Sequence, residues 1–189
     1  LSGEGTRLYF NRSASATTFE LGYGFAVEIA DGAWLDYHGA SGSYAGKDLF
    51  GANTYGWGTI DLVRDGLLGV NAILHKNPNQ TNGVDIRFDC GRLEFYTSNV
   101  SLGANPGPAK NRMTVLAGGG EIIVGAGISH TLAIPVYGEG TMTKSGAGTL
   151  RLVKARDWRA AATTNATDIA VGQCAKTRVA AGTLELEAG

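Results

Sequence analysis

The sequence predicts an all-β protein, built as a single-stranded parallel β-helix of about six to seven coils with protruding loops. Three observations lead to this prediction. Glycine supplies 29 of 189 residues, about twice its usual share of roughly 7%. No long stretch keeps the apolar periodicity of a helix. Short strand-like segments recur about every 29 residues, and a recurrence of that length indicates a solenoid made here of strands and turns.

The recurring unit is a glycine followed by two apolar residues with one position between them. Such a pair lies on one face of a strand, because side chains alternate between the two faces. We expect successive pairs to stack at about 4.8 Å, giving a rod about 29 Å long in six steps. Seven pairs follow one another at intervals of 25–34 residues: 8/10, 35/37, 60/62, 93/95, 122/124, 150/152 and 184/186.

The apolar pairs are expected to point inward and form a continuous core. Glycine is expected at the corners of each coil, where the backbone needs a positive φ or a close approach. The positions next to the pairs carry mostly polar residues, as a solvated face requires. These predicted outward residues are Thr6, Asp36, Asp61, Glu94, Arg151 and Glu185.

Loops are expected to leave the rod where the interval between pairs lengthens. Residues 76–82 and 98–112 are polar and contain proline, which favours exposed turns. Residues 39–57 mix glycine with aromatic residues, and residues 154–178 form the longest excursion. Aromatic side chains in such loops could stack on sugar rings or anchor a partner surface. The candidate binding residues are therefore Tyr44, Tyr55, Trp57 and Trp158.

Charge and cysteine content exclude several classes of function. The chain carries 16 Lys and Arg against 17 Asp and Glu, so it lacks the basic footprint of a nucleic-acid-binding protein. Its apolar stretches are shorter than the ~18 residues of a membrane-spanning helix. Cys90 and Cys174 have no Cys or His near them at metal-ligand spacing, and we predict two ordinary thiols, with a disulfide between them as the alternative. Residues 1–189 are interpreted as one domain, a segment of a longer chain.

A family resemblance appears in the last quarter of the chain. Residues 138–152 read GEGTMTKSGAGTLRL, and residues 177–186 read TRVAAGTLEL. This closely resembles the passenger-associated repeat of bacterial autotransporters, whose pattern runs GxGxLxKxGxGxLxL and then TxVxAGTLxL. Met142 stands where the family has Leu, and about 24 residues separate the halves instead of a short turn. The clear match covers residues 138–189.

This resemblance implies a right-handed parallel β-helix that is exported and displayed at the cell surface or outer membrane, or released outside the cell. In that family the repeats are a scaffold ahead of a C-terminal membrane barrel. The repeat itself brings no catalytic residues and no cofactor. We therefore predict a structural or adhesive segment that presents loops to glycans or host proteins without turnover.

An enzyme is the alternative prediction. Asp85, Arg87 and Asp89 alternate along one strand-like run and share its outward face. Paired carboxylates on such a face could act as general acid and base across a sugar bond. A polysaccharide lyase or glycoside hydrolase is thus the competing hypothesis. His38, His75 and His130 share no motif with each other or with a carboxylate, so we predict no metal site and no cofactor.

Overall fold

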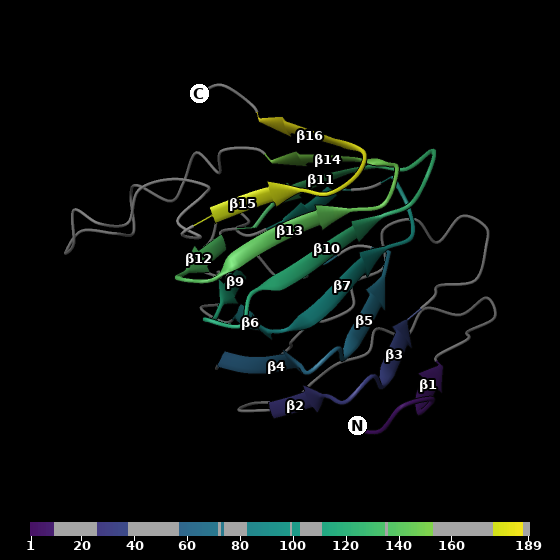
Figure 1. Ribbon diagram of the computed structural model, residues 1–189, viewed down its shortest axis with the longest axis vertical. Helices are drawn as coiled ribbons and strands as arrows, with labels where there is room; N and C mark the ends of the chain where they lie inside the picture. Colours follow the sequence, from purple (N-terminus) through teal and green to yellow (C-terminus); the bar gives the residue numbers. More distant parts are fainter. Residues whose placement is uncertain are drawn as a thin grey trace.

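The computed structural model describes nine ranges of the chain, and all regular structure in them is β-strand (Figure 1). The strands form three sheets, and every strand pair in these sheets is parallel. The all-β prediction is therefore confirmed for these residues. The described ranges are 1–9, 26–37, 57–71, 73, 83–98, 100–102, 111–134, 136–152 and 176–186.

The three sheets differ in their number of strands. The seven-stranded sheet contains, in spatial order, β1 (Arg7–Tyr9), β3 (Trp34–Tyr37), β5 (Leu67–Val70), β7 (Gly91–Phe95), β10 (Gly120–Val124), β13 (Thr141–Ser145) and β15 (Lys176–Val179). The five-stranded sheet contains β2 (Ala26–Ile29), β4 (Trp57–Val63), β6 (Gly83–Asp89), β9 (Arg112–Val115) and β12 (Val136–Gly138). The four-stranded sheet contains β8 (Val100–Leu102), β11 (Ser129–Ala133), β14 (Thr149–Leu152) and β16 (Thr183–Leu186).

The chain visits the sheets in a repeating order. The strands β6, β7 and β8 belong to the five-, seven- and four-stranded sheets in turn, and β9, β10 and β11 repeat that order. Each strand of the second circuit pairs with its counterpart in the first. This arrangement of parallel sheets is compatible with the predicted solenoid, in which every circuit lies on the one before it.

The predicted apolar pairs do not all stack on one another, which corrects the expected register. Leu8 of pair 8/10 and the pairs 35/37, 93/95 and 122/124 belong to strands of the seven-stranded sheet, whereas residue 10 lies outside the described residues. Pair 60/62 lies in β4, and pairs 150/152 and 184/186 lie in β14 and β16. The reason is that all three sheets show the same apolar-in, polar-out alternation. The pattern therefore marks a strand without telling which side of the molecule it occupies.

The core lies between the three sheets and consists of inward apolar side chains in parallel rows. In the five-stranded sheet, Ile60, Ile86 and Met113 occupy successive register positions and are 0–1% exposed. In the seven-stranded sheet, Leu68 and Leu93 are neighbours in register, and both are fully buried. Burying each of these side chains contributes about 1.5–3 kcal/mol, so these rows stabilise neighbouring circuits against one another.

Lys144 interrupts one of these rows. It occupies the inward position of β13 that pairs with Ile122 of β10, and it is 1% exposed. Its ammonium group donates hydrogen bonds to the carbonyls of Ser145, Gly146 and Ala181 at 2.9, 2.5 and 3.0 Å. Burial lowers the pKa of this ammonium. The lysine thus ties the corner after β13 to the corner after β15 through three carbonyl groups.

Corners between the five- and seven-stranded sheets confirm the expected use of glycine. Gly119 has a φ of 80°, a left-handed conformation that glycine adopts at little cost. Gly91 meets a second requirement, since a Cβ atom there would lie 2.2 Å from the Leu62 carbonyl oxygen of the circuit below. Cys90 has a φ of 62°, so this corner places a non-glycine residue in the same left-handed region.

The predicted loops fall mostly outside the described residues, including 39–56, 76–82, 103–110 and 154–175. Three loop predictions are wrong in part. Trp57, the last residue of the predicted loop 39–57, begins β4, β8 lies inside the predicted loop 98–112, and β15 starts inside 154–178. The described ranges hold no helix that is long and apolar enough to cross a membrane.

Candidate functional site

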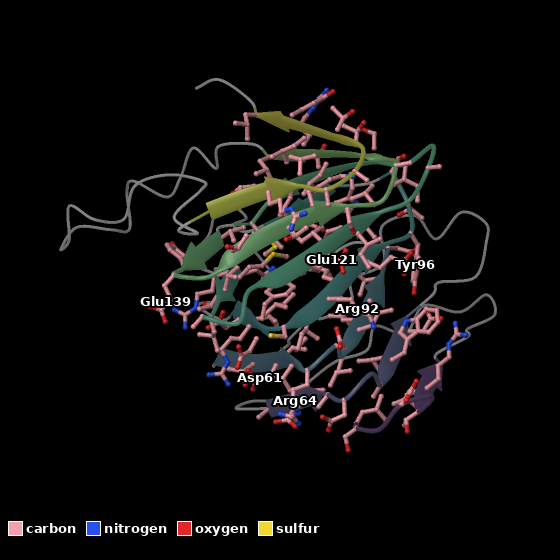
Figure 2. The ribbon with its side chains drawn as sticks, viewed as in Figure 1. Asp61, Arg64, Arg92, Tyr96, Glu121 and Glu139 are labelled. Atoms are coloured by element: carbon pink, nitrogen blue, oxygen red, sulfur yellow. The ribbon has the colours of Figure 1, made fainter. Side chains whose placement is uncertain are left out.

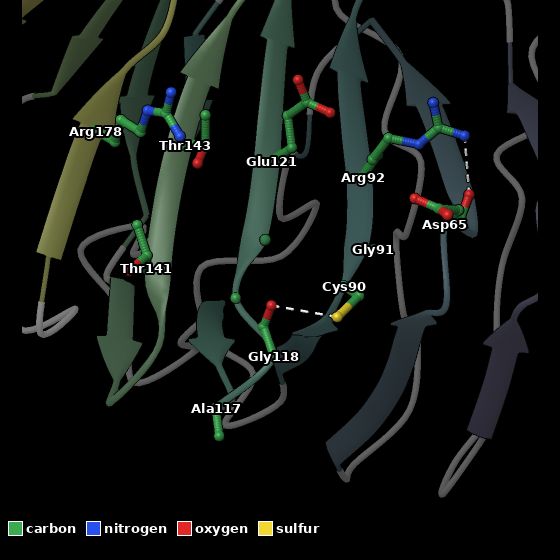
Figure 3. Close-up of a pocket in the computed structure, with 12 residues that line it drawn as sticks. Asp65, Cys90, Gly91, Arg92, Ala117, Gly118, Glu121, Thr141, Thr143 and Arg178 are labelled. Carbon is green, nitrogen blue, oxygen red and sulfur yellow. Dashed lines mark hydrogen bonds between the residues drawn. The ribbon is translucent and has the colours of Figure 1, made fainter.

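A row of polar side chains crosses the outer face of the seven-stranded sheet. Arg92 on β7 pairs in register with Glu121 on β10, Glu121 pairs with Thr143 on β13, and Thr143 pairs with Arg178 on β15. Neighbouring strands lie about 4.8 Å apart, so the row spans about 14 Å between its two arginines. We call these four residues the polar row. Figures 2 and 3 show Arg92 and Glu121 on adjacent strands, and Figure 3 adds Thr143 and Arg178.

The polar row borders a groove of about 460 Å³ at the corner where the five-stranded sheet turns into the seven-stranded sheet (Figure 3). The groove is also lined by Asp65, Cys90, Thr141 and the glycine run 118–120. Three consecutive glycines place no side chain over this corner, which leaves backbone and small polar groups at its surface. The corner therefore offers an open polar surface beside two guanidinium groups.

Cys90 is an exposed free thiol on this surface. Its sulfur donates a hydrogen bond to the Gly118 carbonyl oxygen at 3.3 Å. Gly118 N–H in turn donates to Asp89 Oδ1 at 3.1 Å. A Cβ at Gly118 would lie 2.1 Å from that Asp89 oxygen and 2.8 Å from the Cys90 sulfur. A larger residue at this position would therefore displace the side chains of Asp89 and Cys90.

The arginines of the polar row differ from the other arginines in their partners. Seven arginines lie within the described ranges, and five of these form ion pairs with a carboxylate: Arg7–Asp36, Arg64–Asp31, Arg87–Asp61, Arg112–Asp85 and Arg151–Glu185. Arg92 and Arg178 have no carboxylate partner among the described residues. Arg92 donates one hydrogen bond, to the Asp65 carbonyl oxygen at 3.0 Å. Both unpaired guanidinium groups line the same groove.

A second cluster lies on the same outer face toward β1. Arg7 forms an ion pair with the buried Asp36 carboxylate, and its guanidinium lies 3.7 Å from the centre of the Trp34 ring. Burial and the neighbouring carboxylates raise the pKa of Tyr96, and burial and Asp36 raise the pKa of Glu94. Tyr96 covers Gly69, where a Cβ would lie 1.9 Å from its hydroxyl oxygen. This cluster is closely packed around the Asp36 carboxylate.

The predicted carboxylates of β6 do lie on one outward face, since Ile86 and Phe88 between them are buried. Asp85, however, is 4% exposed, with an ion pair to Arg112 at 2.8 Å and a hydrogen bond from Thr114 at 2.8 Å. Residues four apart on a strand are about 13 Å apart, whereas paired glycosidase carboxylates lie about 5–9.5 Å apart. The backbone of β6 thus holds Asp85 and Asp89 farther apart than that chemistry uses.

Arg87, the third residue of that candidate set, contacts a neighbouring strand. It forms an ion pair with Asp61 of β4, with contacts of 2.5 and 2.6 Å. Among the predicted aromatic binding residues, Trp57 begins β4. Tyr44, Tyr55 and Trp158 lie outside the described residues. The structure thus brings the β6 residues together on one face, and it pairs Trp57 of β4 in register with Gly83 at the start of β6.

His130 and Ser101 form a hydrogen-bonded pair inside the core that sequence analysis missed. His130 is fully buried, with its ring stacked on Phe95 at 3.6 Å between centroids. Its Nε2 lies 2.9 Å from Ser101 Oγ, and its Nδ1 lies 3.0 Å from the Thr97 carbonyl oxygen. Ser101 Oγ also accepts a hydrogen bond from Ile73 N–H at 3.0 Å. Because both ring nitrogens are hydrogen-bonded and the ring has no solvent contact, we interpret this pair as part of the packing and hydrogen bonding of the core.

Within the described ranges, no three or more His, Cys, Asp or Glu side chains are grouped to hold a metal ion. Comparison of the chain with protein-family models, with curated proteins and with solved structures finds no match. The polar row and its groove are therefore assigned from geometry alone. The sequence signal that could have found them is weak, because each of the four residues comes from a different circuit.

Proposed function

We propose that the chain is a right-handed parallel β-helix and a scaffold segment of an exported, autotransporter-like surface protein. The observation that carries this proposal is the repeated order of the three parallel sheets, with each circuit paired in register to the one before it. Right-handed connections between parallel strands occur in about 98% of cases, which supports the handedness. The repeat-like segment 138–152 supplies β13 and β14 on two sides of one circuit.

The proposed role is mechanical and adhesive. Rows of buried side chains hold the circuits together, and the inter-strand spacing of about 4.8 Å sets fixed distances between the side chains on the outer faces. Such a scaffold presents its surfaces and loops to glycans or host surface proteins. No catalytic pair is proposed on β6, because Asp85 is buried against Arg112 and Thr114.

Binding of the purified chain to an array of surface glycans and to immobilised host surface proteins tests the adhesive role. We expect saturable binding to at least one of these classes, and no binding to any would contradict the proposal. Incubation with uronic-acid and neutral polysaccharides tests the enzyme alternative. Release of a product that disappears in Asp89→Ala would favour the enzyme.

The family proposal has a separate test. The segment would be fused to a C-terminal autotransporter barrel and expressed in a Gram-negative host. We expect the segment to become accessible to protease added outside intact cells. Retention inside the cell, with a control passenger displayed normally, would argue against an autotransporter-like scaffold.

A further inference from the structure

We infer that the groove along the polar row binds an acidic polysaccharide, of the class in which uronate carboxylates are carried on a chain of sugar hydroxyls. This inference rests on the proposed adhesive function and names the surface and ligand class for it. Its starting point is the pair of unpaired guanidinium groups, Arg92 and Arg178, which line one groove of about 460 Å³.

The arginines of the polar row indicate that the ligand carries anionic groups. Arginine presents a planar fork that matches a carboxylate, and such charge-assisted pairs are the strong ones. The other five described arginines already have a carboxylate partner in the protein. Arg178 keeps its whole fork for an outside carboxylate. Arg92 keeps only part of it, because its Nη2 already donates to the Asp65 carbonyl oxygen and its Nε is buried.

The two residues in the middle of the polar row indicate that the ligand also carries hydroxyl groups. Glu121 accepts hydrogen bonds, and the Thr143 hydroxyl both donates and accepts, so these side chains suit sugar hydroxyls. A ligand carrying carboxylates at every point would meet Glu121 and Asp65, which also lines the groove, as like charges. A glycan avoids this, because successive sugars turn about the chain axis and only some carboxylates face the row.

The spacing of the row suits an extended polymer better than a small anion. The two guanidinium groups belong to strands three steps apart, a distance of about 14 Å between their backbones. Figure 3 shows the Arg92 guanidinium directed toward Asp65 and away from Glu121, so a single carboxylate or phosphate ion is not placed to contact both arginines. The corner glycines 118–120 carry no side chains, so a linear ligand lying across the strands would meet only small side chains beside the row, those of Cys90, Ala117 and Thr141.

Isothermal titration with an oligogalacturonate tests the inference, using the whole chain in a Cys174→Ser background. We expect binding that weakens with salt, and about tenfold weaker binding in Arg92→Gln and in Arg178→Gln, as the loss of one charge-assisted contact predicts. Arg151→Gln is the matched control. This substitution removes the same charge from an exposed arginine on the four-stranded sheet. The Arg151→Gln variant should therefore bind the oligogalacturonate with the same affinity as the parent.

Reactivity of Cys90 locates the ligand. The thiol is exposed in the groove, so saturating oligogalacturonate should slow its reaction with a maleimide. The oligogalacturonate could bind without protecting Cys90 and with the same affinity in both arginine variants. That result would overturn the groove as the binding site, while adhesion through other surfaces would still stand. Circular dichroism checks that each variant is folded, and the exposed Arg178→Gln keeps the test valid if Arg92→Gln fails to fold.

Two further ligands complete the test. A neutral maltodextrin should not bind, and a polyglutamate peptide should bind at least about tenfold more weakly than the oligogalacturonate. Equal binding of polyglutamate would assign the groove to acidic peptides and overturn the glycan assignment. No binding of oligogalacturonate at all would also overturn it, whatever the glycan array shows for the rest of the molecule.

Discussion

Acidification should destabilise this protein through His130. The imidazole is fully buried, stacked on Phe95, and hydrogen-bonded through both nitrogens. The Thr97 carbonyl can only accept a hydrogen bond, so the neutral ring carries its proton on Nδ1. This leaves Nε2 as the acceptor for the Ser101 hydroxyl. Protonation would turn Nε2 into a donor, so the Ser101 hydroxyl, which already accepts from Ile73 N–H, would have to reverse its bond to the ring. It would also place a charge in the core. Burial accordingly lowers the pKa of His130 to about 4.

The size and sign of the effect follow from the two pKa values. In the unfolded chain the imidazole titrates near 6.5, whereas in the folded chain it titrates at about 4. Between these values the unfolded state binds the proton and the folded state does not. Stability is therefore full above about pH 7 and is lost as the pH falls, by about 2 kcal/mol at pH 5 and about 3 kcal/mol once both states are protonated.

Urea unfolding at pH 7.5 and pH 5 measures this loss. His130→Leu is the comparison variant, because the register neighbour of His130 on β14 is Leu150. The variant should be less stable at pH 7.5, since Ser101 and Thr97 lose their partner. Its stability should nevertheless fall by about 2 kcal/mol less than that of the parent between the two pH values. An identical pH dependence in parent and variant would refute the reasoning.

Two other predictions concern the core rows. Leu150→Asp should abolish folding, because the side chain is 2% exposed and a buried carboxylate without a partner is strongly destabilising. Far-ultraviolet circular dichroism should show the loss of the β spectrum. A folded variant would contradict the inward position of this side chain. Lys144→Met should lower the free energy of unfolding by about 1–3 kcal/mol, since three carbonyls lose their donor. Unchanged urea stability in Lys144→Met would show that those bonds contribute nothing net.

Much of the fold could be predicted from single residues and their spacing. Alternation around Leu93 and Phe95 identifies a strand with its inward face, and both side chains are fully buried. Glycine before such a pair marks a corner, and Gly91 lies where a Cβ would strike the circuit below. These features are local, because strand alternation and turn conformation depend on neighbouring residues.

The stacking partners could not be predicted in the same way. Pair 122/124 follows pair 93/95 on one sheet, whereas pair 150/152 lies on another. Nothing in the local pattern distinguishes them, because every sheet has the same apolar inner face. Lys144 shows the same limit, since its position in the repeat-like segment gives no sign that its ammonium bonds the Ala181 carbonyl, 37 residues away along the chain.

The sequence by itself determined that this is an all-β chain with glycine corners and inward apolar pairs, because those properties depend on residues near one another. The inward prediction is wrong for Leu8 and Leu186 of the first and last pairs, which are 44% and 71% exposed. The tertiary structure alone decided which strands are neighbours, and therefore which outer side chains meet. Arg92, Glu121, Thr143 and Arg178 form one row only because four circuits align in register. A site assembled across circuits leaves little local pattern in the sequence, since its residues are separated by whole turns of the chain.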